Sequence, residues 1–471
     1  MNKTKFLIII TLFIYFISPS FVHGQDNADD PIYIVQPGEN LSIIAEKFGI
    51  AVADLIAANN FADSNIISAG TELIIPGLEG ISGVLSVKPV ELGETVPIIL
   101  NKYEMSIENL LKLNPLTSPS EVYVGTNLVL PISILEDPNR PNQVISISDN
   151  YSLLTESVKG GLNHWEITLQ NITGKPAYQL PDESYFFLNE DTAQSSSIFS
   201  PFIQEIVITP LPLSQGHTAV FKVFHSLPVV ISGSLDGIPL TFHDDTSGQM
   251  AYTLDGIHAL REPGLAELSL QGTFDNGETF QLDQMVLIQS GGYAEETLTV
   301  ESTYIDQELN LQESAKVQEV LSQSADQKYW DGFFRYPVEG ALENETIGFS
   351  SYFGNRRSYN NGEYTGFHGG LDFYVLLNSF NIYAAAPGVV VFAGPMDIRG
   401  FTTFIDHGQG VFSGYAHQSE ILVQVGQFVN QGDLIGLIGK TGRVTGPHLH
   451  WDIWVNGKQV DPFDWIYNQY P

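Results

Sequence analysis

The residues best suited to chemistry lie near the C-terminus, where the stretch GPHLHW (Gly446–Trp451) carries two closely spaced histidines. On a β-strand, residues two positions apart share a face, so His448, His450 and Asp452 point to one side. The apolar residues between and after them point to the other side, into a core: Leu449, Trp451 and Ile453. Both imidazoles are therefore expected to open onto one cleft.

A second stretch, FHGGLDF (Phe367–Phe373), adds His368 and Asp372. The two glycines between them favour a tight, irregular turn, which can aim both side chains at one point. A set of His, Asp and His suits Zn²⁺, and catalytic zinc keeps three protein ligands with one position open. A separate general base is then needed, and GYAHQS (Gly414–Ser419) supplies His417 on a strand facing the same cleft.

Two other interpretations of these histidines stay open at this point. An isolated histidine is more often a hydrogen-bonded core residue, although four with this spacing argue against that interpretation. A structural zinc site usually has four protein ligands and favours cysteine, and the chain contains no cysteine. His407, which lies in a DHG turn, is interpreted as structural.

The elements that must position these residues are strands. From Phe333 onward the chain is rich in glycine-bounded apolar runs and lacks long helical periodicity, which predicts a compact antiparallel β domain over residues 333–471. The Asn456–Gly457 dipeptide predicts a tight hairpin directly after the strand that carries the HLH motif.

This segment resembles the lysostaphin/LytM-type zinc metallopeptidases, which cleave peptide stems and crossbridges of peptidoglycan. Besides FHGGLDF and GYAHQS, the matching motifs are SSYFGNRRSYN (350–360), APGVVVFAG (386–394), IDHGQGV (405–411), VGQFVNQGDLIGLIGKTGRVTGPHLHW (425–451) and VDP (460–462). They span nearly the whole domain. The family usually has leucine where Gln418 stands, which is a peripheral departure.

The resemblance implies a role for each matching residue. It makes His368, Asp372 and His450 the ligands of one Zn²⁺ per chain, and it makes His417 and His448 the catalytic pair that handles protons and the oxyanion. Zinc of this kind activates water and polarises the scissile carbonyl. Further groove residues are candidates for substrate binding: Tyr352, Asn355, Tyr383 and Arg443.

Two other functions compete with a zinc endopeptidase that hydrolyses peptidoglycan peptides. One is a non-catalytic wall-binding or amidase-activating protein, since fold does not fix function. The presence of all three ligands and both helper histidines counts against it. The other is an amidase or carboxypeptidase that applies similar zinc chemistry to a different bond of the wall.

An internal repeat occupies the first part of the chain, where residues 38–60 align without gaps to residues 93–115. Each copy predicts a strand–helix–helix–strand unit and resembles the LysM module, over residues 31–77 and, in a more divergent copy, 84–132. The resemblance implies binding of N-acetylglucosamine-containing glycans between two loops. The residues of those loops are Gly38, Glu39, Asn40, Leu41, Asn65, Ile66 and Ile67.

The middle of the chain predicts structure without indicating function. Residues 142–293 contain short strands parted by turn residues, typical of one or two β-sandwich domains, with an immunoglobulin-like module from Ile206 to Tyr293. Its histidines (164, 217, 225, 243 and 258) lack ligand spacing and are interpreted as structural or surface residues. Residues 294–332 are a predicted linker with a helix between Ile305 and Gln327.

Composition and the N-terminus indicate where the protein acts. The basic start, the apolar run Phe6–Ser18 and the small residues near Gly24 predict a secretory signal peptide over residues 1–24, too short for a typical membrane span. An uncleaved anchor is the alternative. The net charge of −34 argues against nucleic acid as a partner. We therefore expect a secreted, disulfide-free, multidomain protein of the cell wall: two α+β modules, a β-sandwich region and an all-β peptidase domain, without a stable membrane span after signal removal.

Overall fold

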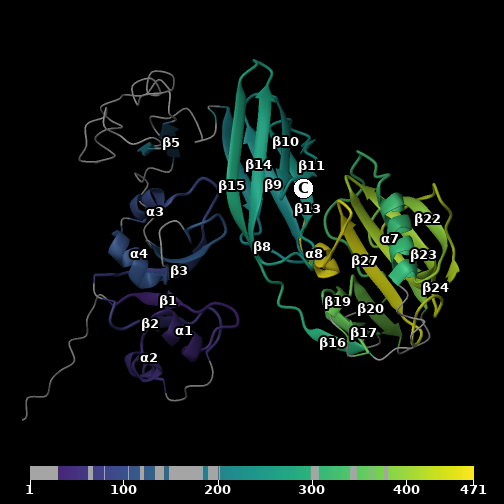
Figure 1. The fold of residues 1–471 in the computed structure, drawn as a ribbon, viewed down its shortest axis with the longest axis horizontal. Coiled ribbons are helices and arrows are strands. Elements are labelled where there is room, and N and C mark those ends of the chain that lie inside the picture. The colour runs from purple at the N-terminus through teal and green to yellow at the C-terminus, as the bar shows by residue number, and fades with distance from the viewer. Residues whose placement is uncertain are drawn as a thin grey trace, which may run out of the picture. The chain divides into compact units, whose positions relative to one another are not determined.

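The structure is a computed structural model of the 471-residue chain, drawn in Figure 1. It describes residues 30–61, 67–78, 80–103, 105–116, 121–132, 143–147, 184–188, 200, 202–298, 307–339, 347–360, 362, 364–375 and 380–471. The predicted signal peptide and His164 lie outside these residues. The chain divides into two compact units, Met1–Ser86 with Pro131–Ile134, and Val87–Leu130 with Leu135–Pro471.

The first unit contains the predicted strand–helix–helix–strand module. Its elements are β1 (Ile32–Ile34), α1 (Leu41–Lys47), α2 (Val52–Asn59) and β2 (Glu72–Ile74), and β1 pairs antiparallel with β2. Leu41, Ile44 and Leu55 form the buried faces of the two helices, as their spacing predicts. The side chain of Asn59 ties α2 to β2, because it donates to the carbonyls of Leu55 and Ile74 and accepts from the Ile74 amide.

The second copy of the repeat has the same construction. Its elements are β3 (Val84–Pro89), α3 (Val96–Lys102), α4 (Ile107–Leu113) and β4 (Asn127–Ile132). Asn114 bonds to Leu110 and Val129 as Asn59 bonds to Leu55 and Ile74, which explains why the asparagine recurs in the repeat. Pro97 lies in the first turn of α3, where its missing N–H costs no helical hydrogen bond.

The middle region is a β-sandwich over residues 203–289. A five-stranded sheet, in the order β11-β10-β14-β15-β8, and a four-stranded sheet, in the order β12-β13-β9-β7, enclose one core. Phe221 and Val223 from one sheet meet Leu268 and Leu270 from the other in that core. The strands are β7 (Ile203–Thr209), β8 (Leu213–Ser214), β9 (Thr218–His225), β10 (Val229–Leu235), β11 (Ile238–Leu240), β12 (His243–Asp244), β13 (Met250–Gly256), β14 (Gly264–Phe274) and β15 (Thr279–Gln289).

Before the sandwich, β5 (Gln143–Ile147) pairs antiparallel with β6 (Ser184–Leu188). Most of the remaining residues between 133 and 201 lie outside the described part. Of the one or two β-sandwich domains predicted, the structure therefore describes one.

The C-terminal domain is built on a ten-stranded sheet whose main path is β17-β20-β27-β24-β23-β22-β25. Its elements are β17 (Ile347–Ser351), β20 (Leu371–Val375), β21 (Asn381–Tyr383), β22 (Gly388–Met396), β23 (Gly400–Gly408), β24 (Val411–Ile421), β25 (Phe428–Val429), β26 (Leu434–Ile438), β27 (Leu449–Val455), β28 (Lys458–Val460) and α8 (Pro462–Tyr467). The pairings within it are antiparallel, as predicted. The predicted hairpin joins β27 to β28, with positive φ at Asn456 and Gly457.

The predicted linker contributes two elements to this domain. Strand β16 (Glu295–Leu298) pairs in parallel with β18 (Arg356–Tyr359), which pairs with β19 (Tyr364–Phe367). Helix α7 (Gln307–Leu321) lies over β22 and β23 (Figure 1). The helix ends six residues before the predicted Gln327, because Ser324 and Ala325 instead donate hydrogen bonds to the Asp406 carboxylate.

Among the described residues, no helix has the length and apolarity that crossing a membrane requires.

Candidate active site

Three side chains converge on one point of the C-terminal domain. Nε2 of His368 lies 3.0 Å from Oδ1 of Asp372 and 3.1 Å from Nδ1 of His450. The same Nδ1 lies 2.8 Å from that oxygen. A triangle of nitrogen and oxygen atoms about 3 Å on a side is what ligands about 2 Å from a common ion form. These residues fit a single zinc ion, and their chemistry is that of a three-ligand site.

The strand register explains why Asp372 and His450 meet. Asp372 on β20 is paired directly with His450 on β27, so their side chains emerge side by side on one face. The glycine turn before β20 allows this close approach. A Cβ atom on Gly370 would lie 2.3 Å from the carbonyl oxygen of Trp451.

Backbone hydrogen bonding fixes which nitrogen of His368 is available. Its Nδ1 lies 2.9 Å from the Tyr352 carbonyl oxygen, and a carbonyl only accepts, so Nδ1 carries the hydrogen. The lone pair of the neutral ring is then on Nε2, the atom within the triangle. Burial lowers the pKa of His368, although the Asp372 carboxylate opposes this shift as an acceptor and a negative charge. The lowered pKa favours the neutral form that a metal ligand needs.

A buried carboxylate lies behind His450. Oδ2 of Asp452 is 3.6 Å from Nε2 of His450, which favours the hydrogen on Nε2 and leaves Nδ1 free to face Asp372. The same oxygen accepts hydrogen bonds from Arg399 and from Gln459. Burial alone would raise the pKa of Asp452, but the Arg399 guanidinium and His450 hold it well below its ordinary value. Asp452 therefore stays ionised as a support for His450.

Sequence reasoning placed Asp452 on the correct face and gave it no role, and Arg399 was missed. A signal for Asp452 was present, since it stands two positions after a candidate ligand on one strand. No local signal marks Arg399, because it lies 53 residues away along the chain from its partner.

The two helper histidines share one hydrogen-bond pattern. Nδ1 of His417 bonds to the Thr441 carbonyl at 2.9 Å, and Nδ1 of His448 bonds to the Gly446 carbonyl at 2.9 Å. Each neutral ring therefore keeps Nε2 as an acceptor. The ring centres lie 4.8 Å apart, and Nε2 of His448 lies 3.9 Å from Oδ2 of Asp372. Burial and the neighbouring His450 and His448 lower the pKa of His417 to about 3, so its resting form is a neutral base.

One groove contains the five histidine and aspartate residues. Its lining includes His368, Asp372, His417, His448 and His450, and its volume is about 1120 Å³. His407 is elsewhere, fully buried and bonded through both nitrogens to Pro387 and Ser413, as expected of a structural residue.

The four predicted substrate-binding residues occupy different places. Arg443 lines the groove, whereas the other three are not among its lining residues. Tyr352 and Asn355 support the site through their backbone: the Tyr352 carbonyl accepts from the His368 ring and the Asn355 carbonyl accepts from the His368 amide. Tyr383 donates to Glu339.

Of the predicted glycan-binding residues, Asn65 and Ile66 lie outside the described residues. The side chain of Glu39 turns inward and bonds to Tyr33 and Lys47. Leu41 is buried. The side chain of Asn40 caps α1, because it accepts a hydrogen bond from the Ile43 amide. Gly38 adopts a φ of 84°, and Ile67 is half-buried.

Comparisons with known proteins identify two kinds of domain in the chain. Residues 366–462 match peptidase family M23, and residues 33–76 and 90–131 match the LysM domain. Peptidoglycan DD-endopeptidase ShyA of Vibrio cholerae is 39% identical over 129 residues, which cover 27% of this chain and 29% of that protein. DD-carboxypeptidase/endopeptidase Mpg of Neisseria meningitidis is 40% identical over 95 residues, or 20% and 22% of the two chains.

A crystal structure described as a putative peptidase M23 from Pseudomonas aeruginosa is 25% identical, with a TM-score of 0.39. The match covers 54% of this chain and 95% of that one. The sequence matches to the two named relatives each cover less than a third of either protein. The chain therefore carries a peptidase family M23 domain near its C-terminus and two LysM domains ahead of it.

Proposed function

We propose that this protein is a zinc endopeptidase that hydrolyses peptide bonds in peptidoglycan. The observation that carries the proposal is the triangle of His368, Asp372 and His450 atoms in a groove that also holds His417 and His448. Zinc held by the three ligands would supply an acidified water and a positive charge beside the scissile carbonyl. The relative named as a peptidoglycan DD-endopeptidase supports the substrate class.

The chain's own residues would handle the protons. Neutral His417 has Nε2 free to accept a proton from the attacking water, because its Nδ1–H is held by the Thr441 carbonyl. His448 that has taken a proton from solvent can donate from Nε2 to the developing oxyanion or to the leaving amine, and His417 then returns the proton of the attacking water to solvent. Asp452 keeps His450 oriented, and the two backbone-bound histidines cannot easily rotate away from the groove.

We further propose that the LysM domains hold the enzyme on wall glycan. Tethering a cutting domain to its substrate raises the local concentration of cleavable bonds. In this proposal residues 1–24 direct export, 31–77 and 84–132 bind glycan, 142–293 and 294–332 connect, and 333–471 cleave. The protein then acts in the cell wall or outside the cell.

Digestion of purified sacculi, followed by mass analysis of the released muropeptides, tests the function. We expect new peptide termini with the zinc-loaded protein. His450→Ala should lose both zinc and cleavage, whereas His448→Ala should keep zinc and lose about 100-fold or more in turnover. Intact muropeptides from a protein with full zinc content would favour the non-catalytic wall-binding function instead. Release of single terminal residues would indicate a carboxypeptidase, and separation of intact peptides from glycan would indicate an amidase.

A further inference from the structure

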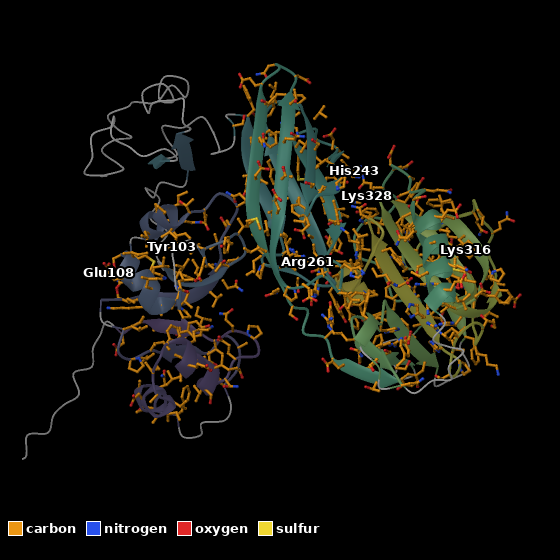
Figure 2. The ribbon with its side chains drawn as sticks, in the orientation of Figure 1. Tyr103, Glu108, His243, Arg261, Lys316 and Lys328 are labelled. Carbon is orange, nitrogen blue, oxygen red and sulfur yellow. The ribbon has the colours of Figure 1, made fainter. Side chains whose placement is uncertain are left out.

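The helix of the connecting segment reaches the active site. Val317 and Leu321 of α7 pack into a cluster with Met396, Phe404 and Trp454 of the sheet. Lys316, labelled in Figure 2, extends from the same helix and places its ammonium over the ring of Phe392 at 5.2 Å. Asn310, Glu313, Ser314, Val317 and Gln318 line the groove that holds the candidate zinc ligands. The helix is thus one wall of that groove.

One carboxylate of this helix, that of Glu313, is buried and hydrogen-bonded to the β22–β23 turn. Glu313 is only 7% exposed, whereas Glu308 and Glu319 of α7 are exposed. Its Oε2 accepts from the Ile398 amide at 2.6 Å and its Oε1 accepts from the Arg399 amide at 3.0 Å. Burial of a carboxylate is costly unless its lone pairs are used. The two consecutive amides of the β22–β23 turn supply those hydrogen bonds.

The same turn contacts both halves of the site. The Arg399 side chain donates to Asp452, which faces His450. The Arg399 carbonyl accepts from the backbone amide of His417 at 2.8 Å. Displacement of Arg399 would therefore disturb both His450, a candidate metal ligand, and His417, the candidate neutral base.

We propose that Glu313 is a positioning residue of the active site, which fixes the turn at Ile398 and Arg399 and thereby holds His450 and His417 in place. Helix α7 of the connecting segment then contributes to the activity of the peptidase domain. This inference rests on the proposed function for its kinetic consequence, but the hydrogen bonds that it invokes are independent of that function.

The test uses the full-length protein with Glu313→Ala, the milder Glu313→Gln, which keeps one acceptor oxygen, and Glu319→Ala as a control on the same helix. Hydrogen–deuterium exchange should become about 10-fold faster at the amides of Ile398 and Arg399 in Glu313→Ala. The zinc dissociation constant, measured by chelator competition, should rise about 10-fold. On sacculi, kcat should fall about 10-fold with KM nearly unchanged. Glu313→Gln should follow the same pattern more weakly, and Glu319→Ala should match the wild type.

A Glu313→Ala protein with a lower melting temperature but wild-type exchange, zinc affinity and kcat would show that Glu313 is merely structural and would overturn the proposal. Should Glu313→Ala fail to fold, the same three measurements on Glu313→Gln decide. If wild-type protein binds zinc but cleaves nothing, the proposed function fails, while exchange and zinc affinity still test Glu313.

Discussion

At the scale of single residues, backbone carbonyls define the chemistry of this site. Tyr352, Thr441 and Gly446 each accept a hydrogen from Nδ1 of a histidine, which leaves Nε2 of that ring free. His450 is oriented in the opposite sense by Asp452, so that its Nδ1 is the free nitrogen. The different jobs proposed for the two histidines of the HLH motif follow from these partners.

Replacement of Asp452 by asparagine tests this orientation. The substitution removes the charge behind His450 and leaves the half-buried Arg399 guanidinium without its counter-ion. We expect zinc to bind about 10-fold or more weakly, since such supporting carboxylates typically contribute 10–100-fold to metal affinity. Chelator competition gives the value, with the exposed Asp275→Asn as a control. Equal zinc affinity in Asp452→Asn and wild type would rule out this role.

At the scale of elements, strand periodicity predicted part of the site and could not predict the rest. Alternation correctly placed His450 and the buried Trp451 on opposite faces of β27. His417 is a different case, because Ala416 is the residue paired with His450. Strict alternation would turn His417 to the opposite face. A φ of 62° and a register shift between β23 and β24 return it to the groove, and neither feature is visible in the sequence.

The glycine turn before β20 provides an element-scale prediction. In Gly370→Ala the new methyl group would lie 2.3 Å from a backbone oxygen of β27, so strands must separate. We expect the C-terminal domain to lose about 1–3 kcal/mol of stability, the usual effect of overpacking. Differential scanning calorimetry measures the change. Gly366→Ala is the matched control, because a Cβ at Gly366 meets nothing within 4 Å. Equal melting temperatures of Gly370→Ala and Gly366→Ala would contradict the close packing of the turn at Gly370.

At the scale of the whole molecule, the sandwich and the peptidase domain share a polar contact at the start of α8. Nδ1 of His217 bonds to Asp464 at 2.8 Å, and the Asp464 carboxylate also accepts from the Thr218 amide. The Asp461 amide donates to the Gly216 carbonyl. The sequence predicted a structural or surface role for His217 but not its partner, which lies 247 positions away along the chain.

This contact should be pH-dependent. The hydrogen bond to Asp464 raises the pKa of His217, so its stabilisation is fully present below about pH 6.5 and is lost as pH rises through the raised pKa. Burial raises the pKa of Asp461 to about 6, so the cost of ionising this carboxyl disappears as pH falls below that value. Both effects favour the folded contact at mildly acidic pH.

A double-mutant cycle of His217→Ala and Asp464→Asn isolates the pair. The coupling energy from thermal unfolding should be about 1 kcal/mol near pH 5.5 and smaller near pH 8.5. A coupling that grows with pH would show that the pair is not charged as described.

The central claim is that His368, Asp372 and His450 hold one ion, and the most direct measurement is elemental analysis of purified, zinc-repleted protein. We predict one zinc per chain in the wild type and in the exposed-site control Asp275→Ala, and almost none in Asp372→Ala. Wild-type protein without stoichiometric zinc, or Asp372→Ala with as much zinc as the wild type, would contradict the account.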